Sequence, residues 1–553
     1  MDNKPESKHL LEMRGLRIEG QSGEEWLEIV KGIDLTLDRG QMLGLIGESG
    51  AGKSTIGLAA MGFARPGCRF SGGEILFDGV DLRELRRKDR RSLRGVRIAY
   101  VAQSAAASFN PAHRLIDQFS EIPVEHGISS KSEAEADAID LFTRLKMPFP
   151  DVIGFRYPHQ VSGGQLQRAM TAMALSCRPD LIIFDEPTTA LDVTTQIEVL
   201  VTIRDVVKQF NTAAIYITHD LAVVAQMSDK IIVLRYGEKV EEAETRVMLS
   251  DPKQDYTKSL WAVRSFTKSS KPPEHEQVPL MRVEHVTAAY GKDVILKDIS
   301  FDIHRGQTVA VVGESGSGKS TTARVITGLL PPLQGSVFFD GVPLPADYRK
   351  RSKDQLRQAQ MIYQMADTAV NPRHKIRDII GRPLSFYLGL GGAKLEQRIR
   401  ELLDMIELDP DVFIDRYPGE LSGGQKQRVC IARALAAEPK FIICDEVTSA
   451  LDQLVAEGIL KLLDRLQQEF NLAYMFITHD LATVRAIADR VVVMLQGEIV
   501  EQGSKDTVFS PPHHEYTNLL LSSVPEMDPD WLDNMLKSKV DSPDIVRSSD
   551  IIR

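Results

Sequence analysis

GESGAGKST at residues 47–55 returns with a single change, as GESGSGKST, at residues 313–321. Each copy directly follows a short apolar run, MLGLIG or TVAVVG, of the kind that forms a buried β-strand. Where such a strand turns through glycines into a helix, backbone N–H groups converge on phosphate oxygens. The lysine reaches the β- and γ-phosphates and the next hydroxyl binds magnesium. The two copies therefore predict two phosphate-binding loops, formed by Gly47, Gly50, Gly52, Lys53, Ser54 and Thr55 and by Gly313, Gly316, Gly318, Lys319, Ser320 and Thr321.

The repeat extends far beyond these loops. Three further pairs of segments match at a constant spacing of 260 positions: RYPHQVSGGQLQR (156–168) with RYPGELSGGQKQR (416–428), LIIFDEPTTALD (181–192) with FIICDEVTSALD (441–452), and AAIYITHDLAVV (213–224) with AYMFITHDLATV (473–484). A constant spacing over several motifs indicates a duplicated domain. We expect a first domain over residues 9–263, a flexible linker over 264–279, a second domain over 280–522 and a C-terminal tail over 523–553.

Both halves alternate apolar β-runs with helical patterns, which is typical of an α/β fold with a largely parallel sheet. Residues 112–160 and 373–420 have helical periodicity instead, so each half is expected to carry a helical insert beside a mixed β core. The tail is polar except for WLDNMLKSKV at 531–540, whose apolar side chains fall roughly on one helical face. It is either a mobile end or a helix that packs on the second domain or on its neighbour.

In both halves an apolar strand ends in an acidic pair, and a histidine follows 33 residues after the second carboxylate. The first carboxylate suits a magnesium partner beside the loop, and the second could polarise an attacking water. Taken singly, such a pair can merely cap a strand and such a histidine is usually structural. Because both recur, we favour catalytic roles, with the histidine bonded to the γ-phosphate, for Asp185, Glu186 and His219 and for Asp445, Glu446 and His479.

The composition is that of a soluble globular protein, with 43% apolar and 26% charged residues. The net charge of −10 makes nucleic acid an unexpected partner, since phosphate neutralisation supplies much of the affinity for it. No apolar run approaches the roughly 18 residues needed to span a bilayer, so we expect the chain itself to stay in the cytoplasm. We expect no disulfide, zinc site or iron–sulfur cluster, because no CxxC spacing links Cys68, Cys177, Cys430 and Cys444.

The order of these motifs resembles that of ATP-binding cassette ATPases: a phosphate loop, a glutamine, SGGQ, the strand with its acidic pair, ALD and the histidine. The motif order occurs once in each half, so the resemblance spans nearly the whole chain. It implies two tandem P-loop ATPase domains of this type. It implies that ATP and Mg²⁺ bind at both loops and that Glu186, His219, Glu446 and His479 are catalytic. The magnesium ligands that it implies are Ser54, Gln103 and Asp185 in one domain and Ser320, Gln364 and Asp445 in the other.

The same resemblance implies that each ATP is sandwiched between the loop of one domain and the SGGQ of the other. The residues that would close over the opposite nucleotide are Ser162, Gly163, Gly164 and Gln165 and Ser422, Gly423, Gly424 and Gln425. Asp192 and Asp452 would couple the two sites. Tyr290 fits the adenine-stacking aromatic of the second domain, whereas the comparable place in the first is near Gly20, where Trp26 could substitute.

Further details are similar to the peptide and nickel importer branch of this family: SFNP (108–111), VNPR (370–373) and the YT elements at 251–260 and 510–520. Two such domains in one chain resemble the ATP-binding subunit of microcin C (Yej-type) peptide importers. The resemblance implies a peripheral subunit on the cytoplasmic face of the inner membrane, docked on two transmembrane permease subunits that an external substrate-binding protein serves. The alternative is a soluble tandem-domain ATPase of the ribosome, which the short linker and negative charge disfavour.

Overall fold

The computed structural model describes residues 8–188, 191, 193–262, 268, 278–449 and 451–541, without the side chains of 262 and 538–541. The chain divides into two compact units. The first unit comprises residues 1–262 and 525–553, and the second comprises residues 263–524. Each unit therefore contains one copy of the repeat, and the C-terminal tail groups with the first copy although it follows the second.

The first unit is built on two sheets. Its strands are β1 (Leu11–Ser22), β2 (Glu25–Leu37), β3 (Met42–Gly47), β4 (Cys68–Phe77), β5 (Val80–Asp81), β6 (Ile98–Val101), β7 (Leu181–Asp185), β8 (Ala213–Ile217), β9 (Lys230–Arg235) and β10 (Glu238–Glu244). A six-stranded sheet has the order β10-β9-β3-β8-β7-β6 and is parallel except for β10, and an antiparallel sheet has the order β2-β1-β4-β5. All residues of β3 and β7 are buried, which explains why both read as unbroken apolar runs.

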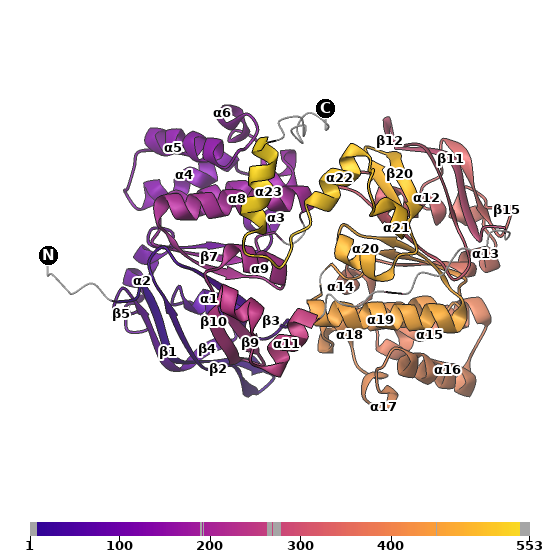
Figure 1. Ribbon diagram of the computed structural model, residues 1–553. Helices are drawn as coiled ribbons and strands as arrows, with labels where there is room; N and C mark the ends of the chain where they lie inside the picture. The colour runs from indigo at the N-terminus through magenta and orange to yellow at the C-terminus, as the bar shows by residue number, and fades with distance from the viewer. Residues whose placement is uncertain are drawn as a thin grey trace. The chain divides into compact units, whose positions relative to one another are not determined.

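Helices cover these sheets and form the predicted insert. They are α1 (Lys53–Ala59), α2 (Arg87–Leu93), α3 (Ala105–Ser108), α4 (Leu115–Glu125), α5 (Lys131–Arg144), α6 (Pro150–Ile153), α7 (Gly163–Leu175), α8 (Val193–Phe210), α9 (Leu221–Met227), α10 (Thr245–Ser250), α11 (Asp255–Ala262) and, from the tail, α23 (Trp531–Asp541). In Figure 1, α4, α5 and α6 lie together, apart from β1, β2 and β4 of the same unit. The α/β fold with a helical insert is thus confirmed for the first unit.

The second unit repeats this plan. Its strands are β11 (Met281–Tyr290), β12 (Asp293–Ile303), β13 (Thr308–Val312), β14 (Gln334–Phe339), β15 (Val342–Pro343), β16 (Ala359–Ile362), β17 (Phe441–Asp445), β18 (Ala473–Ile477), β19 (Arg490–Leu495) and β20 (Glu498–Ser504). They form sheets of order β16-β17-β18-β13-β19-β20 and β12-β11-β14-β15, the same topology as in the first unit. The repeated sequence therefore specifies a repeated fold.

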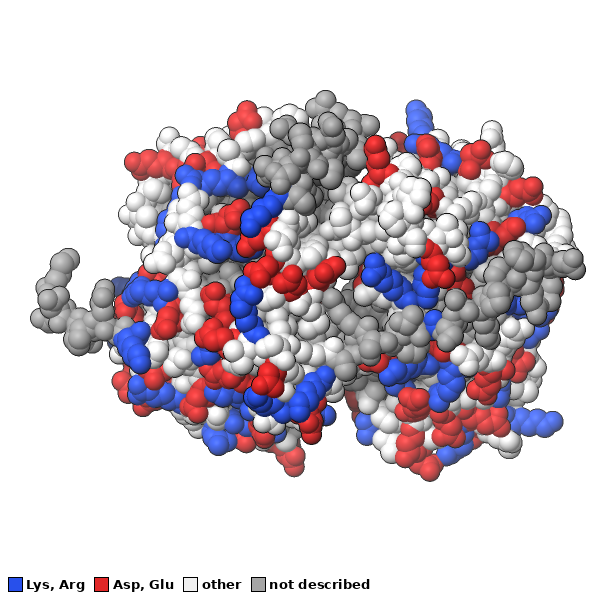
Figure 2. Space-filling view, in the orientation of Figure 1, with Lys and Arg blue, Asp and Glu red and all other residues white. Residues whose placement is uncertain are grey.

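The helices of the second unit correspond one by one to α1–α11 of the first, and the tail helix α23 has no counterpart among them. They are α12 (Lys319–Ile326), α13 (Lys353–Gln358), α14 (Ala366–Ala369), α15 (Ile376–Leu388), α16 (Gly392–Met405), α17 (Pro410–Phe413), α18 (Gly423–Leu435), α19 (Gln453–Phe470), α20 (Leu481–Ile487), α21 (Lys505–Val508) and α22 (Glu515–Ser522). Within the described part of the chain, none of the helices is both long and apolar enough to cross a membrane. On the visible face, acidic and basic side chains are interspersed over both units (Figure 2).

The tail helix α23 packs on α8 of the first unit, one of the possibilities that the sequence left open. Leu532 and Met535 are buried and form an apolar cluster with Ile197 and Val201 of α8. Trp531 and Leu536 pack against the edge of this cluster. Arg204 donates to Asp533 at 2.7 Å beside it. An apolar stripe on α23 therefore meets an apolar stripe on α8, and an ion pair fixes their register.

Replacing Leu532 by Ala is expected to loosen the tail. Leu532 is fully buried, and a buried Leu-to-Ala change costs about 2–5 kcal/mol through lost burial and the resulting cavity. Limited proteolysis with mass spectrometry should then show faster cleavage within the last 30 or so residues, with the rest of the chain unchanged. Asn534→Ala, on the exposed side of the same helix, is the matched control. Equal cleavage rates for both variants would contradict this packing.

The predicted flexible linker over 264–279 lies mostly outside the described residues, but Lys268 is described and is held firmly. Its backbone N–H donates to the carbonyl of Ala486 at 2.8 Å, and its ammonium donates to Asp489 at 2.9 Å and to the side-chain carbonyl of Gln467. The side chains of Lys268 and Asp489 are only 6% and 8% exposed. The expectation of a freely moving coil is therefore wrong at Lys268, where a buried ion pair anchors the chain to the second unit.

Candidate functional site

The two phosphate loops have the same backbone conformation. Gly47 and Gly313 begin them with φ of 146° and 144°, and a Cβ at either place would lie 2.1–2.2 Å from a backbone carbonyl oxygen of β9 or β19. Only glycine fits such a contact. In each loop the buried lysine folds back over it: Lys53 donates to the carbonyls of Gly47 and Glu48 at 2.6 and 2.9 Å, and Lys319 donates to the corresponding pair at 2.8 and 2.7 Å. Two backbone carbonyls thereby fix the ammonium group within each loop.

The hydroxyl that follows each lysine meets the first carboxylate of the acidic pair. Ser54 donates to Asp185 at 2.9 Å, and Ser320 donates to Asp445 at 3.3 Å. The serine lies in the first turn of the helix after the loop, and the aspartate ends β7 or β17, which β8 or β18 separates from the strand before the loop. The fold thus brings together groups 131 and 125 residues apart. A hydroxyl and a carboxylate oxygen at this distance are the hard oxygen donors that Mg²⁺ prefers, and they fit that ion.

The second carboxylate of each pair is held between the glutamine and the histidine. Gln103 donates to Glu186 at 2.8 Å, and His219 Nδ1 lies 3.2 Å from the other oxygen of that carboxylate. In the second unit Gln364 donates to Glu446, and His479 Nδ1 lies 3.4 Å from it. The structure thus brings together, in each unit, the lysine, serine, aspartate, glutamate, glutamine and histidine that the sequence singled out.

The backbone at both glutamates is unusual. Glu186 and Glu446 each have φ of 49°, in the left-handed region that costs a non-glycine residue free energy. Both donate their backbone N–H groups to the last residue of the next strand, Ile217 or Ile477, at 2.9 Å. These bonds hold the turns after β7 and β17 in place. The chain leaves the strand direction there, and the glutamate carboxylate contacts the glutamine and the histidine.

The glutamate of each pair changes the pKa of its histidine, and in the second unit the histidine also changes the pKa of its glutamate. Burial opposes the charge on His219 and His479, but the neighbouring glutamate outweighs it and raises the pKa of both rings above the ordinary value. Burial likewise opposes the charge on Glu446, but contact with His479 outweighs it and lowers the pKa of that carboxyl. The second pair therefore favours a carboxylate beside an imidazolium, which keeps Glu446 ready to accept a hydrogen bond from water.

The two sites differ at one residue that the sequence did not single out. The hydroxyl of Tyr100, on β6, donates to Asp185, whereas the corresponding position on β16 is Met361. In the second site, burial and then the charge of Glu446 raise the pKa of Asp445. Alignment of the two copies shows this difference three residues before each glutamine, but a tyrosine in a β-run is more often a packing residue. The first site therefore holds its aspartate more tightly than the second does.

The SGGQ segments begin helices α7 and α18. Ser162 caps α7 by accepting from the N–H of Gln165 at 3.3 Å, and Gln165 accepts from the N–H of Ser162 at 3.0 Å; Ser422 and Gln425 make the same pair. This reciprocal capping leaves Ser162 and Gly163 exposed. The second glycine is needed for packing, because a Cβ on Gly164 or Gly424 would lie 2.4 Å from a side chain of α8 or α19.

The remaining predicted residues occupy less constrained places. Tyr290 ends β11, is 42% exposed and accepts a hydrogen bond from Arg324 at 2.6 Å. Trp26 lies near the start of β2, 37% exposed, with the guanidinium of Arg69 4.0 Å above its ring. Asp452 caps α19 by accepting from the N–H of Val455. Its partner in the prediction, Asp192, lies outside the described residues.

Comparisons with known proteins agree with this arrangement. The family described as ABC transporter matches residues 30–189 and 296–449, and the family described as Oligopeptide/dipeptide transporter, C-terminal region, matches residues 500–548. The chain is 36% identical over 564 residues to the glutathione import ATP-binding protein GsiA of Pectobacterium atrosepticum, covering 94% of this chain and 90% of that protein. It is also 36% identical over 567 residues to the GsiA protein of Escherichia coli K12, with the same coverage.

A solved structure, that of cbiO1 from Clostridium perfringens, part of the ABC transporter complex cbiONQ, aligns with 42% of this chain and 90% of its own at 30% identity and a TM-score of 0.38. The family match extends over both repeats and includes both phosphate loops and both acidic pairs. Together with the nearly full-length relatives, it identifies the chain as an ATPase with two fused cassettes that belongs to the ABC transporter family.

Proposed function

We propose that this chain uses ATP hydrolysis at two sites to drive the import of short peptides through a membrane permease. The observation that carries this proposal is the oligopeptide/dipeptide transporter C-terminal region at residues 500–548, in a chain whose nearly full-length relatives are named for glutathione import. Glutathione is a tripeptide, so both comparisons favour the same class of substrate. They also favour import over the ribosomal alternative, and they give no preference for microcin C.

Each site would bind one ATP with its phosphates in the glycine loop. Lys53 and Lys319 would exchange their loop carbonyls for the β- and γ-phosphates, since an ammonium is drawn to the greater charge. Ser54 with Asp185, and Ser320 with Asp445, would hold Mg²⁺, with Gln103 and Gln364 as further oxygen ligands. When bound, the ion neutralises charge that develops on the phosphates during transfer.

The glutamates would act on the water that attacks the γ-phosphate. Glu186 and Glu446 each have one carboxylate oxygen on a glutamine and one beside a histidine, which fixes the direction of the group. A fixed carboxylate aligns the water and takes up its proton as the bond to phosphorus forms. The protonated histidine can at the same time donate to the γ-phosphate. The exposed SGGQ starts of α7 and α18 would close over the nucleotide bound by the opposite cassette.

The partners would be two permease subunits on the cytoplasmic side of a cell membrane, with an external protein that delivers the peptide. We expect the permease to dock on the helical inserts, α4 to α6 and α15 to α17, because each begins shortly after the glutamine that contacts the catalytic glutamate. A shift of that glutamine on ATP binding would then reach the docking surface directly. The chain would thus be peripheral to the membrane.

Co-purification and uptake together test this function. An affinity-tagged chain, expressed in its native host and extracted with detergent, should retain multi-spanning membrane proteins, as identified by mass spectrometry. Deleting its gene should abolish uptake of labelled glutathione or of a labelled dipeptide, and the wild-type gene should restore it. The Glu186→Gln, Glu446→Gln chain is the matched control, because it should retain the permease without restoring uptake. Retention of ribosomal proteins in place of membrane proteins would overturn the proposal.

A further inference from the structure

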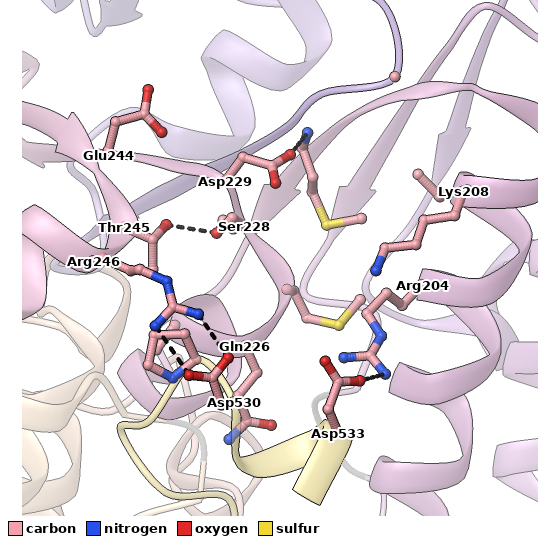
Figure 3. Close-up of a pocket in the computed structure, with 16 residues that line it drawn as sticks. Arg204, Lys208, Gln226, Ser228, Asp229, Glu244, Thr245, Arg246, Asp530 and Asp533 are labelled. Atoms are coloured by element: carbon pink, nitrogen blue, oxygen red, sulfur yellow. Dashed lines mark hydrogen bonds and ion pairs between the residues drawn. The ribbon is translucent and has the colours of Figure 1, made fainter. Parts of the chain in front are cut away.

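The two units have a corresponding structural position just after the carboxyl end of α9 or α20. In the first unit this position borders a cavity of about 450 Å³ between α8, α9, the start of β9 and the tail (Figure 3). Its floor includes Asp229, which accepts from the N–H of Met42, the first residue of β3, at 2.8 Å. In the second unit Asp489 accepts in the same way from Thr308, the first residue of β13. The two carboxylates therefore mark one structural position.

At this position each unit contacts a segment that follows the C-terminal helix of the other repeat. After α11 of the first repeat, the backbone N–H of Lys268 donates to Ala486 in the second unit. After α22 of the second repeat, the backbone carbonyl of Glu526 accepts from Gln226 in the first unit at 2.7 Å. Gln226 and Ala486 occupy the same position, 260 residues apart, in the two repeats. The chain thus exchanges these segments, which we call the first strap (Lys268) and the second strap (525–541).

The second strap makes ionic as well as apolar contacts across the mouth of the cavity. Asp530 accepts two hydrogen bonds from Arg246 at 2.6 and 3.0 Å, and Asp533 accepts one from Arg204 (Figure 3). Arg204 is 8% exposed, and its contact lies beside the apolar cluster of Leu532 and Met535. This strap is therefore held by matched charge and shape, which distinguishes it from a chain end that merely rests on the surface.

The second unit, from which the second strap emerges, lacks the residues that hold this strap on the first unit. The positions that correspond to Ile197 and Val201 are Glu457 and Lys461, which pair with one another at 2.6 Å on the surface of α19. Those that correspond to Arg204 and Arg246 are Asp464 and Asp506. Two aspartates in place of two arginines would repel Asp533 and Asp530. The sequence therefore directs the second strap to the first unit and away from the unit from which it emerges.

From this reciprocal placement we propose that the two straps form a noncovalent clasp that keeps the two cassettes paired without nucleotide and without the covalent link between them. The first strap contacts the ends of α19 and α20, and the second contacts α8 from Ile197 to Arg204 and the end of α9. None of these contacts involves a residue of the glycine loops, so ATP need not be present for the straps to stay docked. The cassettes would therefore remain partners through the whole cycle of ATP binding and release.

Cutting the chain between the straps tests the clasp. A cleavage site for a sequence-specific protease, placed within residues 269–277, leaves the first strap on one half and the second strap on the other. After complete cleavage, verified on a denaturing gel, the two halves should elute together in size-exclusion chromatography with EDTA and no nucleotide. The cleaved chain with Lys268→Ala, Leu532→Asp and Met535→Asp should elute as separate halves, with an apparent dissociation constant at least about tenfold higher. Asn534→Asp is the matched control and should stay paired.

Separation of the unaltered cleaved halves would overturn the proposal, and so would persistent pairing of the triple variant. A charge exchange guards against misfolding, because Arg246 and Asp530 are both largely exposed. Arg246→Asp, which copies the second repeat, and Asp530→Arg should each weaken pairing by about two- to fivefold, the range expected for an exposed ion pair. The two changes together should restore it. Failure of this rescue would show that the tail does not carry the pairing.

Discussion

Glu186→Gln and Glu446→Gln will each lower ATP turnover at their own site by about 10²–10⁴-fold, the usual contribution of a general base. The amide keeps the size of the side chain but can neither take a proton from the attacking water nor keep the ion pair with His219 or His479. The double variant should bind ATP without hydrolysing it. Phosphate release in single turnover measures the chemical step, and retained labelled ATP after gel filtration measures trapping.

Glu498→Gln is the control for this experiment. Glu498 is 59% exposed and pairs with Lys297 at 3.3 Å, so its neutralisation should leave turnover unchanged. If Glu186→Gln or Glu446→Gln left turnover at the unmodified rate, the corresponding cassette would bind ATP for regulation only. Tyr100 donates to Asp185 in the first site, and the second site lacks this bond. The ATP turnover rates of the two single variants should therefore be compared quantitatively.

Lys268→Ala is expected to destabilise the second unit by about 3–5 kcal/mol, the effect of removing one partner of a buried ion pair. Its ammonium is nearly inaccessible to water and satisfies Asp489 and Gln467 together, so the change leaves a buried carboxylate without its counter-charge. Chemical denaturation should show the transition of the second unit at lower denaturant while that of the first is unchanged.

Lys297→Ala provides the comparison, because the pair of Lys297 with Glu498 is exposed and should contribute less than about 1 kcal/mol. A short deletion within 269–277 that spares Lys268 should also have little effect, since loop entropy varies slowly with length. Equal stability of the Lys268→Ala and Lys297→Ala chains would contradict the anchoring role of Lys268.

The sequence predicted the fold and the composition of each catalytic cluster because their signals are local and repeated. The glycine loop sets its own backbone, the unbroken apolar runs of β3 and β7 require a buried parallel sheet, and the acidic pair ends such a strand. Lys268 shows what this reasoning could not reach. It lies among Ser, Thr and Pro residues that are typical of a linker, and its partners Gln467 and Asp489 are about 200 residues away.

Tyr100 and Leu532 were missed or left open for related reasons. A tyrosine in a β-run carries no sign that its hydroxyl meets a carboxylate on the next strand, which only the register of β6 on β7 determines. The apolar face of α23 was visible in the sequence, but its receptor on α8 was not, because Ile197 and Val201 read as part of an ordinary amphipathic helix. A position-by-position comparison of α8 with α19, where Glu457 and Lys461 stand instead, is the signal that could have found it.

Because α23 is translated late, an apolar surface of the first cassette stays uncovered while the rest of the chain is synthesised. Ile197 and Val201 are made with the first repeat, but the residues that cover them, Leu532 and Met535, are made only after the second repeat. At about 5–20 residues per second, the ribosome needs roughly 15–70 s to translate the intervening chain. For that time a folded first cassette presents an uncovered apolar stripe to other nascent chains. A fragment that ends before the tail exposes this apolar stripe permanently. The isolated first cassette will therefore need polar residues in place of Ile197 and Val201, like Glu457 and Lys461 of the second repeat, to avoid aggregation.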